Sequence, residues 1–284
     1  MKLRAYAKIN LGLLVLGKRP DGYHNIETVF RLIDIYDEVD FLQNDGGIVF
    51  KSDSALLADD NTNLCVRAAN LLRDLTGIHV GVDITLTKRI PLGAGLGGGS
   101  SDAAAVLKGL TKLWALDIST EELQTISATL GSDVPFFFQS PTAFAQGRGE
   151  RLTPFDLTIP YWILVATPPI HVSTGWAYSH LTLQPPEQRP DLITLLLKDI
   201  GNPAILRTHL VNDFEESVCQ RFPEIAELKH SMLTTGAVFS LMSGSGSSVF
   251  GFFDSDAAAS RAQEKLSRQH FTALTSPSFS PEIN

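Results

Sequence analysis

The most informative segment of the chain is Pro91-Leu-Gly-Ala-Gly-Leu-Gly-Gly-Gly-Ser-Ser-Asp-Ala-Ala-Ala105. Its glycines have no Cβ, so the backbone can turn left-handed and come close to a ligand. Apolar residues follow at helical spacing up to Trp114, so the glycine loop opens a helix whose positive end faces it. Backbone N–H groups at such a helix start favour phosphate. The sequence therefore predicts a loop that holds a polyphosphate.

Other glycine-loop chemistries fit less well. A nucleotide P-loop has a lysine after its last glycine, whereas Ser100 follows Gly99 here. The spacing Gly93-x-Gly95-x-x-Gly98 matches the dinucleotide fingerprint, but four residues separate it from the preceding strand-like run 80–87. The chain also has no His-Arg-Asp or Asp-Phe-Gly triplet of protein kinases. A plain Gly/Ser linker is disfavoured because linkers rarely open into an alanine-rich amphipathic helix.

The segment Leu3–Val15 alternates apolar and polar residues, which predicts a half-buried strand. Period two puts Lys8 and Asn10 side by side on the face away from the core, where they can point into a cleft. A phosphate loop without its own lysine needs a cation from elsewhere, and we predict that Lys8 supplies it. The alternative is an ordinary solvated strand face.

Residues 18–24 form a turn by composition, and Tyr23 and His24 stand at its exit. An aromatic ring beside an imidazole can stack on a nucleobase and hydrogen-bond it. A histidine that merely caps the turn is the alternative.

The remaining pattern mixes strands and helices. We expect strands at 30–33, 38–43 and 48–51, the last two joined as a hairpin through residues 44–47. Helices are expected over 63–75, ending before Gly77, and after the capping box Ser119–Glu122. Later come an edge hairpin at 142–149, a strand from 161, helices near 192–198, 213–219, 224–234 and 257–266, and strands at 237–242 and 249–253. A second glycine loop, 243–248, joins these last two strands, and its N–H groups are predicted to help hold substrate phosphates.

Asp133 lies in Gly-Ser-Asp-Val-Pro-Phe-Phe-Phe, residues 131–138. Pro135 favours an extended turn, and a carboxylate beside three aromatic rings can be partly desolvated. From the pattern alone, Asp133 reads first as a cap of the helix that follows.

Composition limits the function classes. With 284 residues, 44% of them hydrophobic and 19% charged, the chain reads as a soluble α+β protein of two domains, 1–154 and 155–284, with the boundary near Pro154. Its net charge of -8 argues against nucleic acid as a partner. The absence of a long apolar run argues against the membrane, and we expect a cytoplasmic protein. Cys65 and Cys219 form no metal-like or disulfide-like pair, in keeping with a reducing compartment.

The run Pro91–Ser101 resembles the ATP-binding motif of the GHMP small-molecule kinases, the superfamily of galactokinase, homoserine kinase and mevalonate kinase. The resemblance implies ATP and Mg²⁺ as cofactors, with Ser100 or Ser101 as a metal ligand. It makes Asp133 the catalytic base, and Lys8 then stabilises the transferring phosphoryl group. The nucleotide-binding residues it implies are Pro91, Leu92, Gly93, Ala94, Gly95, Leu96, Gly97, Gly98, Gly99, Ser100 and Ser101.

Two further motifs, Ala7-Lys-Ile-Asn-Leu11 and Arg19-Pro-Asp-Gly-Tyr-His24, are most similar to one branch of that superfamily. That branch phosphorylates the 2-hydroxyl of a small molecule, a cytidine diphosphate derivative of methylerythritol, in non-mevalonate (MEP) isoprenoid biosynthesis. The resemblance implies that His24, with Tyr23 beside it, recognises cytosine. It also implies that Thr174 and an aromatic residue, Tyr178 by spacing or else Trp176, line the cytidine site, and that Asn10 orients the substrate.

The same resemblance implies a two-domain GHMP kinase fold, with an N-terminal domain like that of ribosomal protein S5, a ferredoxin-like C-terminal domain and an active site in the cleft between them. We expect a monomer or a weak homodimer. Three rivals stay open: another kinase of the superfamily, of the homoserine or mevalonate type; a nucleotide-dependent oxidoreductase; and a non-catalytic metabolite sensor on the kinase fold.

Overall fold

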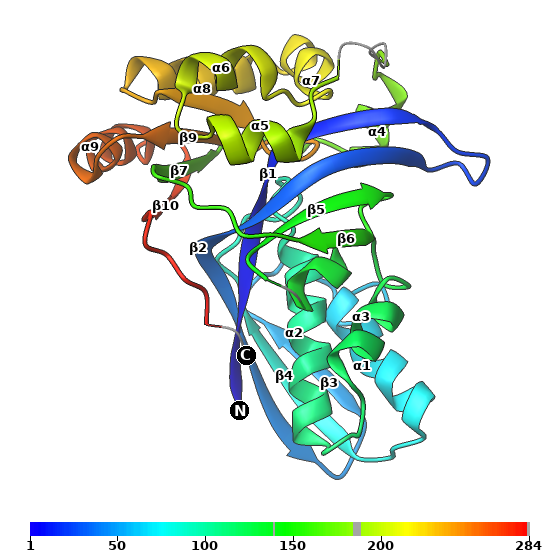
Figure 1. Ribbon diagram of the computed structural model, residues 1–284. Coiled ribbons are helices and arrows are strands. Elements are labelled where there is room, and N and C mark those ends of the chain that lie inside the picture. The colour runs from blue at the N-terminus through cyan, green and yellow to red at the C-terminus, as the bar shows by residue number, and fades with distance from the viewer. Residues whose placement is uncertain (139, 184–188, 283–284) are drawn as a thin grey trace.

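The computed structural model describes residues 1–138, 140–183 and 189–282, and Figure 1 shows two sheets, each with its own helices. The first sheet has the strand order β3-β4-β2-β5-β6, and β1 pairs with β2. Three helices pack beside it in the lower part of Figure 1. The bounds of these elements are β1 Lys2–Lys18, β2 His24–Asn44, β3 Ile48–Ser52, α1 Leu64–Thr76, β4 Gly81–Thr87, α2 Gly98–Leu113, α3 Thr120–Ser127, β5 Thr142–Gly147 and β6 Arg151–Pro154.

The second sheet has the order β10-β7-β9-β8, and each neighbouring pair is antiparallel. Taken along the chain, a strand, a helical segment, a hairpin of two strands, a helix and a last strand build it, which is the ferredoxin-like arrangement expected from the resemblance. Its elements are β7 Trp162–Thr167, α4 Thr174–Ser179, α5 Leu192–Asp199, α6 Pro203–His209, α7 Glu215–Arg221, α8 Pro223–Thr234, β8 Phe239–Met242, β9 Val249–Phe253, α9 Asp256–Leu266 and β10 Phe271–Thr275.

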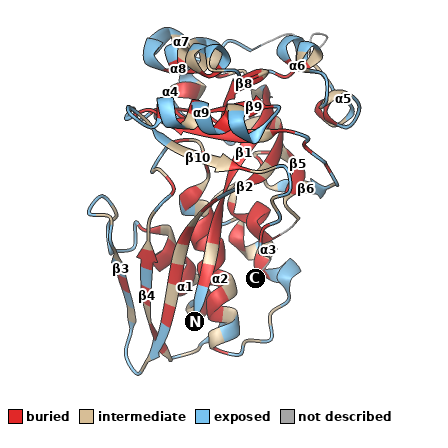
Figure 2. Cartoon of the chain, turned by 90° about the vertical axis from the view of Figure 1, so that its left-hand side faces the viewer, coloured by how far each residue is buried: buried red, intermediate tan, exposed pale blue. Residues whose placement is uncertain are grey.

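The long strands β1 and β2 tie the two parts together, and Figure 1 shows them running from the lower sheet up beside α5 and α4. The prediction of a half-buried strand at Leu3–Val15 was wrong, because most residues of β1 are buried on both faces. Figure 2 shows this burial as a nearly continuous red course. One cluster of buried residues takes Ile9 and Leu11 from β1 together with Phe250 and Phe252 from β9. The alternation failed because the polar face is covered as well: Lys8 lies over the ring of Phe30, and Asn10 is hydrogen-bonded to Thr28.

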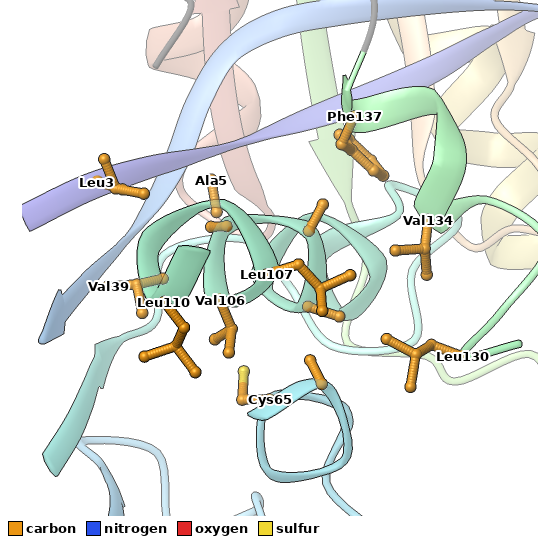
Figure 3. Packing of buried hydrophobic residues seen from close by; sticks show 14 of the residues in the cluster. Leu3, Ala5, Val39, Cys65, Val106, Leu107, Leu110, Leu130, Val134 and Phe137 are labelled. Atoms are coloured by element: carbon orange, nitrogen blue, oxygen red, sulfur yellow. The ribbon is translucent and has the colours of Figure 1, made fainter. Parts of the chain in front are cut away.

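Local signals placed the helices of the first part well. Asn63 accepts a hydrogen bond from the Cys65 N–H and caps α1, which ends at Gly77 in the left-handed conformation. Ser119 and Glu122 form the predicted capping box. α2 lies between β1 and α1, and Figure 3 shows Val106 and Leu110 of this helix facing Cys65. Helix α2 is therefore held in the hydrophobic core that the first sheet forms with its helices.

Three local predictions were wrong or incomplete. β3 does not form a hairpin with β2; it pairs in parallel with β4, which lies between them. The segment Val134–Phe138 is a buried 3₁₀ helix and not an extended turn. Neither α6 nor β10 was predicted. The chain leaves the first sheet at Pro154 and enters the second at Trp162; the domain boundary near Pro154 remains a prediction.

No helix in the described residues is long and apolar enough to cross a bilayer.

Candidate active site

A cleft of about 900 Å³ collects most of the residues that the sequence singled out. Lys8, Asn10, Tyr23, His24, Asp133, Thr174 and Tyr178 all line it, together with Gly93, Gly95 and Gly97 of the glycine loop. Its walls come from β1, the start of β2, the loop before α2, the segment before the 3₁₀ helix, and α4. Residues from both parts of the chain thus meet in one hollow.

The glycine loop has the geometry that its composition predicts. Gly93, Gly95 and Gly97 have φ values of 61°, 79° and 70°, and Gly97 directly precedes the first turn of α2. Within that turn, the Ser101 N–H donates to the Gly97 carbonyl. Gly98, Gly99 and Ser100 complete the turn. Pro91, Leu92 and Ala94 do not line the main cleft; they face a neighbouring hollow with Pro168 and Pro169.

The second glycine loop, 243–248, packs directly on the first. The Ser243 hydroxyl donates to the Gly95 carbonyl at 2.9 Å, and the Ser248 N–H donates to the Ala94 carbonyl at 3.1 Å. A side chain on Gly95 would run into the Ser243 carbonyl. Gly244 and Ser245 remain on the cleft surface. Part of the second loop's hydrogen-bonding capacity is therefore used to support the first loop.

Lys8 and Asp133 form an ion pair in the cleft, with Nζ 3.3 Å from Oδ2. The Lys8 side chain is 5% exposed and that of Asp133 is 32% exposed. Lys8 also donates to Asn10 Oδ1 at 2.7 Å, and the Asn10 amide donates to the Thr28 hydroxyl at 2.9 Å. A buried ammonium beside a more exposed carboxylate can neutralise developing phosphoryl charge while the carboxylate takes a proton.

The two rings assigned to a base lie against each other. His24 and Tyr178 stack with centroids 4.6 Å apart and planes 16° apart. Tyr178 also packs edge-on against Phe214. Burial, helped by the charge of Asp133, raises the pKa of Tyr178 to about 12, and burial followed by the charge of Lys18 lowers the pKa of His24.

Residues of α4 differ in whether they line the cleft. The Thr174 hydroxyl lies 3.1 Å from that of Ser245 at the cleft surface. Trp176 instead stacks on His180 and packs against Phe222, and it does not line the cleft. Of the two aromatic candidates left open by the sequence, Tyr178 is the one that the structure brings beside His24.

The two serines proposed as metal ligands point to different surroundings. Ser101 is buried and lines a small hollow with Lys108 and Tyr6, away from the main cleft. Ser100 instead lies beside Gly131, two residues before Asp133. In the part of the chain that the structure describes, no group of three His, Cys, Asp or Glu residues could hold a metal by itself. Hydroxyl oxygens suit Mg²⁺ when nucleotide phosphates complete its set of ligands, and Ser100 would supply one such oxygen.

The sequence did not reveal a buried ionic cluster at the start of α2. Lys88 pairs with both Asp37 and Asp102, and all three side chains are at most 6% exposed. Burial first, opposed by Lys88 and aided by Asp37, raises the pKa of Asp102 to about 8. Within the described part of the chain, Asp102 Oδ1 has no hydrogen-bond partner. A lysine between a strand and the glycine loop was the signal, but its partners lie 51 and 14 positions away.

Three more ionisable residues of the cleft had been given no role. His171 lies on the glycine loop, since a Cβ on Gly93 would come within 2.6 Å of its ring. Lys18 and Arg148 line the cleft near Tyr23 and His24. Nothing in the local sequence distinguishes these side chains from solvated ones.

Comparisons with known proteins agree with this geometry. Family models match the chain as the GHMP kinases N terminal domain over residues 63–140 and as the GHMP kinases C terminal domain over 193–273. The 4-diphosphocytidyl-2-C-methyl-D-erythritol kinase of Prosthecochloris aestuarii is 44% identical over 282 residues, covering 98% of each chain. A crystal structure of 4-(cytidine 5'-diphospho)-2C-methyl-D-erythritol kinase superposes with a TM-score of 0.82 at 36% identity, covering 97% of this chain and 98% of the other.

A structure with lower sequence identity has the same fold. Homoserine kinase from Cytophaga hutchinsonii superposes with a TM-score of 0.71 at 18% identity, over 95% of this chain and 94% of that one, and so shares the fold alone. The α+β, two-domain GHMP kinase fold expected from the sequence is confirmed. With close relatives matched over nearly their full length, the chain belongs to the 4-diphosphocytidyl-2-C-methyl-D-erythritol kinase family of the GHMP kinases.

Proposed function

We propose that the protein transfers the γ-phosphoryl group of ATP to the 2-hydroxyl of 4-diphosphocytidyl-2-C-methyl-D-erythritol, a step of the MEP route to isoprenoid precursors. One observation carries the proposal: a single cleft contains the glycine loop, the Lys8–Asp133 ion pair and the stacked rings of His24 and Tyr178. These are a phosphate site, a base with its cation, and a platform for a nucleobase. The names of the family's close relatives supply the substrate.

In this proposal the residues Pro91–Ser101 hold the nucleotide, whose triphosphate lies at the N-terminus of α2. Mg²⁺ bound with it offsets charge on the β- and γ-phosphates, and Ser100 is the better placed of the two serines to contact the ion. Ser101 lines a separate hollow with Lys108 and Tyr6, which supports the choice of Ser100. Phosphoryl transfer needs mainly positioning and charge stabilisation, which a rigid loop and a buried cation provide.

Asp133 acts as the base that accepts the proton of the acceptor hydroxyl. Lys8, held by its hydrogen bond to Asn10, neutralises charge on the phosphoryl group as it moves. Asn10 is itself fixed by Thr28, so it can orient both Lys8 and the acceptor. Tyr23, His24, Thr174 and Tyr178 bind the cytidine end.

The decisive experiment replaces the base. Asp133→Asn keeps the shape of the side chain but cannot take the proton, so ADP release with the cytidyl substrate should fall about 10³-fold, with both substrates still bound. Asp117→Asn, at an exposed position, is the matched control and should leave turnover unchanged. Near-normal turnover in the Asp133 variant would remove Asp133 from the mechanism.

The choice of acceptor needs a separate assay. ADP release from Mg-ATP is followed with the cytidyl substrate, homoserine and mevalonate in parallel. Release with the cytidyl substrate alone supports the proposal, while release with homoserine or mevalonate keeps the mechanism and discards the cytidine site. No release with any of them favours a non-catalytic sensor. The proposal also includes a cytoplasmic protein, monomeric or weakly dimeric, without a nucleic-acid partner, which the net charge of -8 supports.

A further inference from the structure

The acceptor proposed above carries a diphosphate between its base and its reacting alcohol, and that anion needs cations of its own. Of the residues that the structure describes, three lysine or arginine residues line the cleft, namely Lys8, Lys18 and Arg148. Lys8 is engaged by Asp133 and Asn10, at the place where the phosphoryl group is transferred. The other two cations remain for a second anion.

Lys18 lies at the cytidine end of the cleft. In the ladder between β1 and β2 it stands directly opposite His24, and its charge helps to lower the pKa of that imidazole. Among the residues that the structure describes, Lys18 forms no ion pair. An uncompensated ammonium at the wall of a cleft attracts an anionic group of a ligand.

Arg148 approaches the same place from the turn between β5 and β6. Its guanidinium lies over the ring of Tyr23, with Cζ 4.8 Å from the centroid. The next residue, Gly149, lies beside Asp133, since a Cβ there would be 3.6 Å from Oδ1. Arg148 thus contacts Tyr23, at the end of the cleft assigned to the base, and the residue after it lies beside Asp133, the carboxylate assigned to the reacting hydroxyl.

The ion pair that Arg148 forms with Glu150 is weak. Its Nε is 3.9 Å from Glu150 Oε1, and the Glu150 carboxylate also accepts a hydrogen bond from the backbone N–H of Arg148. The Arg148 side chain is 28% exposed, so its guanidinium is open to the cleft. The planar guanidinium presents paired N–H donors that match phosphate oxygens, and stacking on Tyr23 orients it in advance.

We propose that Arg148 and Lys18 form a diphosphate subsite that binds the phosphates of the acceptor, separately from the phosphate site of the glycine loop. This inference rests on the proposed function. It makes the two residues determinants of acceptor specificity: they favour a cytidine diphosphate ester over an alcohol without phosphate, and they leave the affinity for ATP unchanged.

The test measures binding of cytidine, CMP and CDP to the full chain by titration calorimetry. For the unaltered protein, affinity should rise with each phosphate. Arg148→Gln and Lys18→Gln should each lower the affinity for CDP about tenfold or more, as expected for loss of a charge-assisted contact, and change that for cytidine less than about twofold. Arg151→Gln is the matched control, because Arg151 is exposed three positions along and does not line the cleft.

Each outcome has a separate meaning. Equal loss of affinity for cytidine and CDP would show that Arg148 only positions Tyr23, and unchanged CDP binding would also overturn the subsite. A rise in KM for ATP in either variant would place these cations at the nucleotide instead. If the unaltered protein binds none of the three ligands, the proposed function fails and the subsite fails with it. In steady state, we expect KM for the acceptor to rise with kcat little changed.

Discussion

The two glycine loops of this molecule have similar compositions and different settings. Residues 91–97 lead into α2, a helix of 16 residues that packs in the hydrophobic core of the first sheet, whereas 243–248 join β8 directly to β9. The second loop donates Ser243 and Ser248 hydrogen bonds to carbonyl groups of the first. The helix after a glycine loop, more than the glycines themselves, therefore determines whether the loop offers N–H groups and a helix dipole to an anion. The other loop supports it.

The largest effect should come from the contact between the loops. Gly95→Ala forces a side chain into the Ser243 carbonyl at a φ of 79°. We expect the free energy of unfolding to fall by about 2 to 4 kcal/mol in urea titration and ATP turnover to fall sharply. Gly236→Ala is the control, with a φ of 110° but no atom within 4 Å, and should lose only about 1 kcal/mol from backbone strain. Equal losses would mean that the loops do not depend on their contact.

The next largest effect should come from the buried carboxyl group of Asp102, near the start of α2. The folded pKa of Asp102, about 8, lies above its ordinary value of 3.8. The stability that this carboxyl contributes is therefore fully present below about pH 4 and lost as pH rises to about 8. Asp102→Asn removes that dependence, so the variant should gain stability relative to the unaltered protein between pH 5 and about pH 8, measured by urea unfolding. A constant difference across this range would contradict the assignment.

A smaller effect is expected from the supporting serine. Ser243→Ala removes the hydroxyl that donates to the Gly95 carbonyl and accepts the Asn10 N–H, at a cost of about 1 to 2 kcal/mol in unfolding free energy. Because the first loop loses its support, KM for ATP should also rise. Ser240→Ala, which loses a buried hydrogen bond to the Phe250 carbonyl, should lower stability alone. If KM for ATP rose equally in both variants, the rise could not be attributed to the support that Ser243 gives to the first loop.

The smallest effect concerns the first turn of α2. A Cβ on Gly99 meets only Leu64 Cδ1, at 3.6 Å. Gly99→Ala should therefore raise the free energy of unfolding by about 0.5 kcal/mol through helix propensity, measured by thermal unfolding. It should also weaken ATP binding, since the added methyl group narrows the approach to the N–H groups of the turn. Stabilisation without any change in ATP affinity would place the triphosphate elsewhere on the loop.

Local chemistry explains what the sequence could predict. Asn63, Gly77 and Ser119 carry capping signals that act within a few residues, and the structure has the helix ends close to where they indicate. The glycine loop and α2 were equally readable. Strand pairing depends on distant partners. The composition of residues 44–47 suggests a hairpin between β2 and β3, yet β3 pairs with β4, which follows α1 in the chain.

The site shows the same limit. Lys8 and Asn10 were predicted from their parity in one strand, and they do lie side by side. Their meeting with Asp133 depended on the resemblance, because 125 positions separate Lys8 from Asp133 in the sequence. No role was predicted for Arg148, on the predicted edge hairpin, or for His171, because their contacts, to Tyr23 and Gly93, join segments that no periodicity relates.

The stack of His24 on Tyr178 also sets a reference state for every ligand of the cleft. Rings with centroids 4.6 Å apart already fill one another's contact surface, and a third ring between them needs planes about 7 Å apart, twice the contact spacing of carbon atoms. A ligand that inserts between the two rings must first separate them, so it loses the ring contacts that the free protein already makes. Its apparent affinity is the intrinsic affinity multiplied by the fraction of protein in which the rings are apart. A flat inhibitor that stacks on an outer face of the pair avoids that reduction. Potency in this cleft will depend on which face is chosen as much as on how well a ring fits.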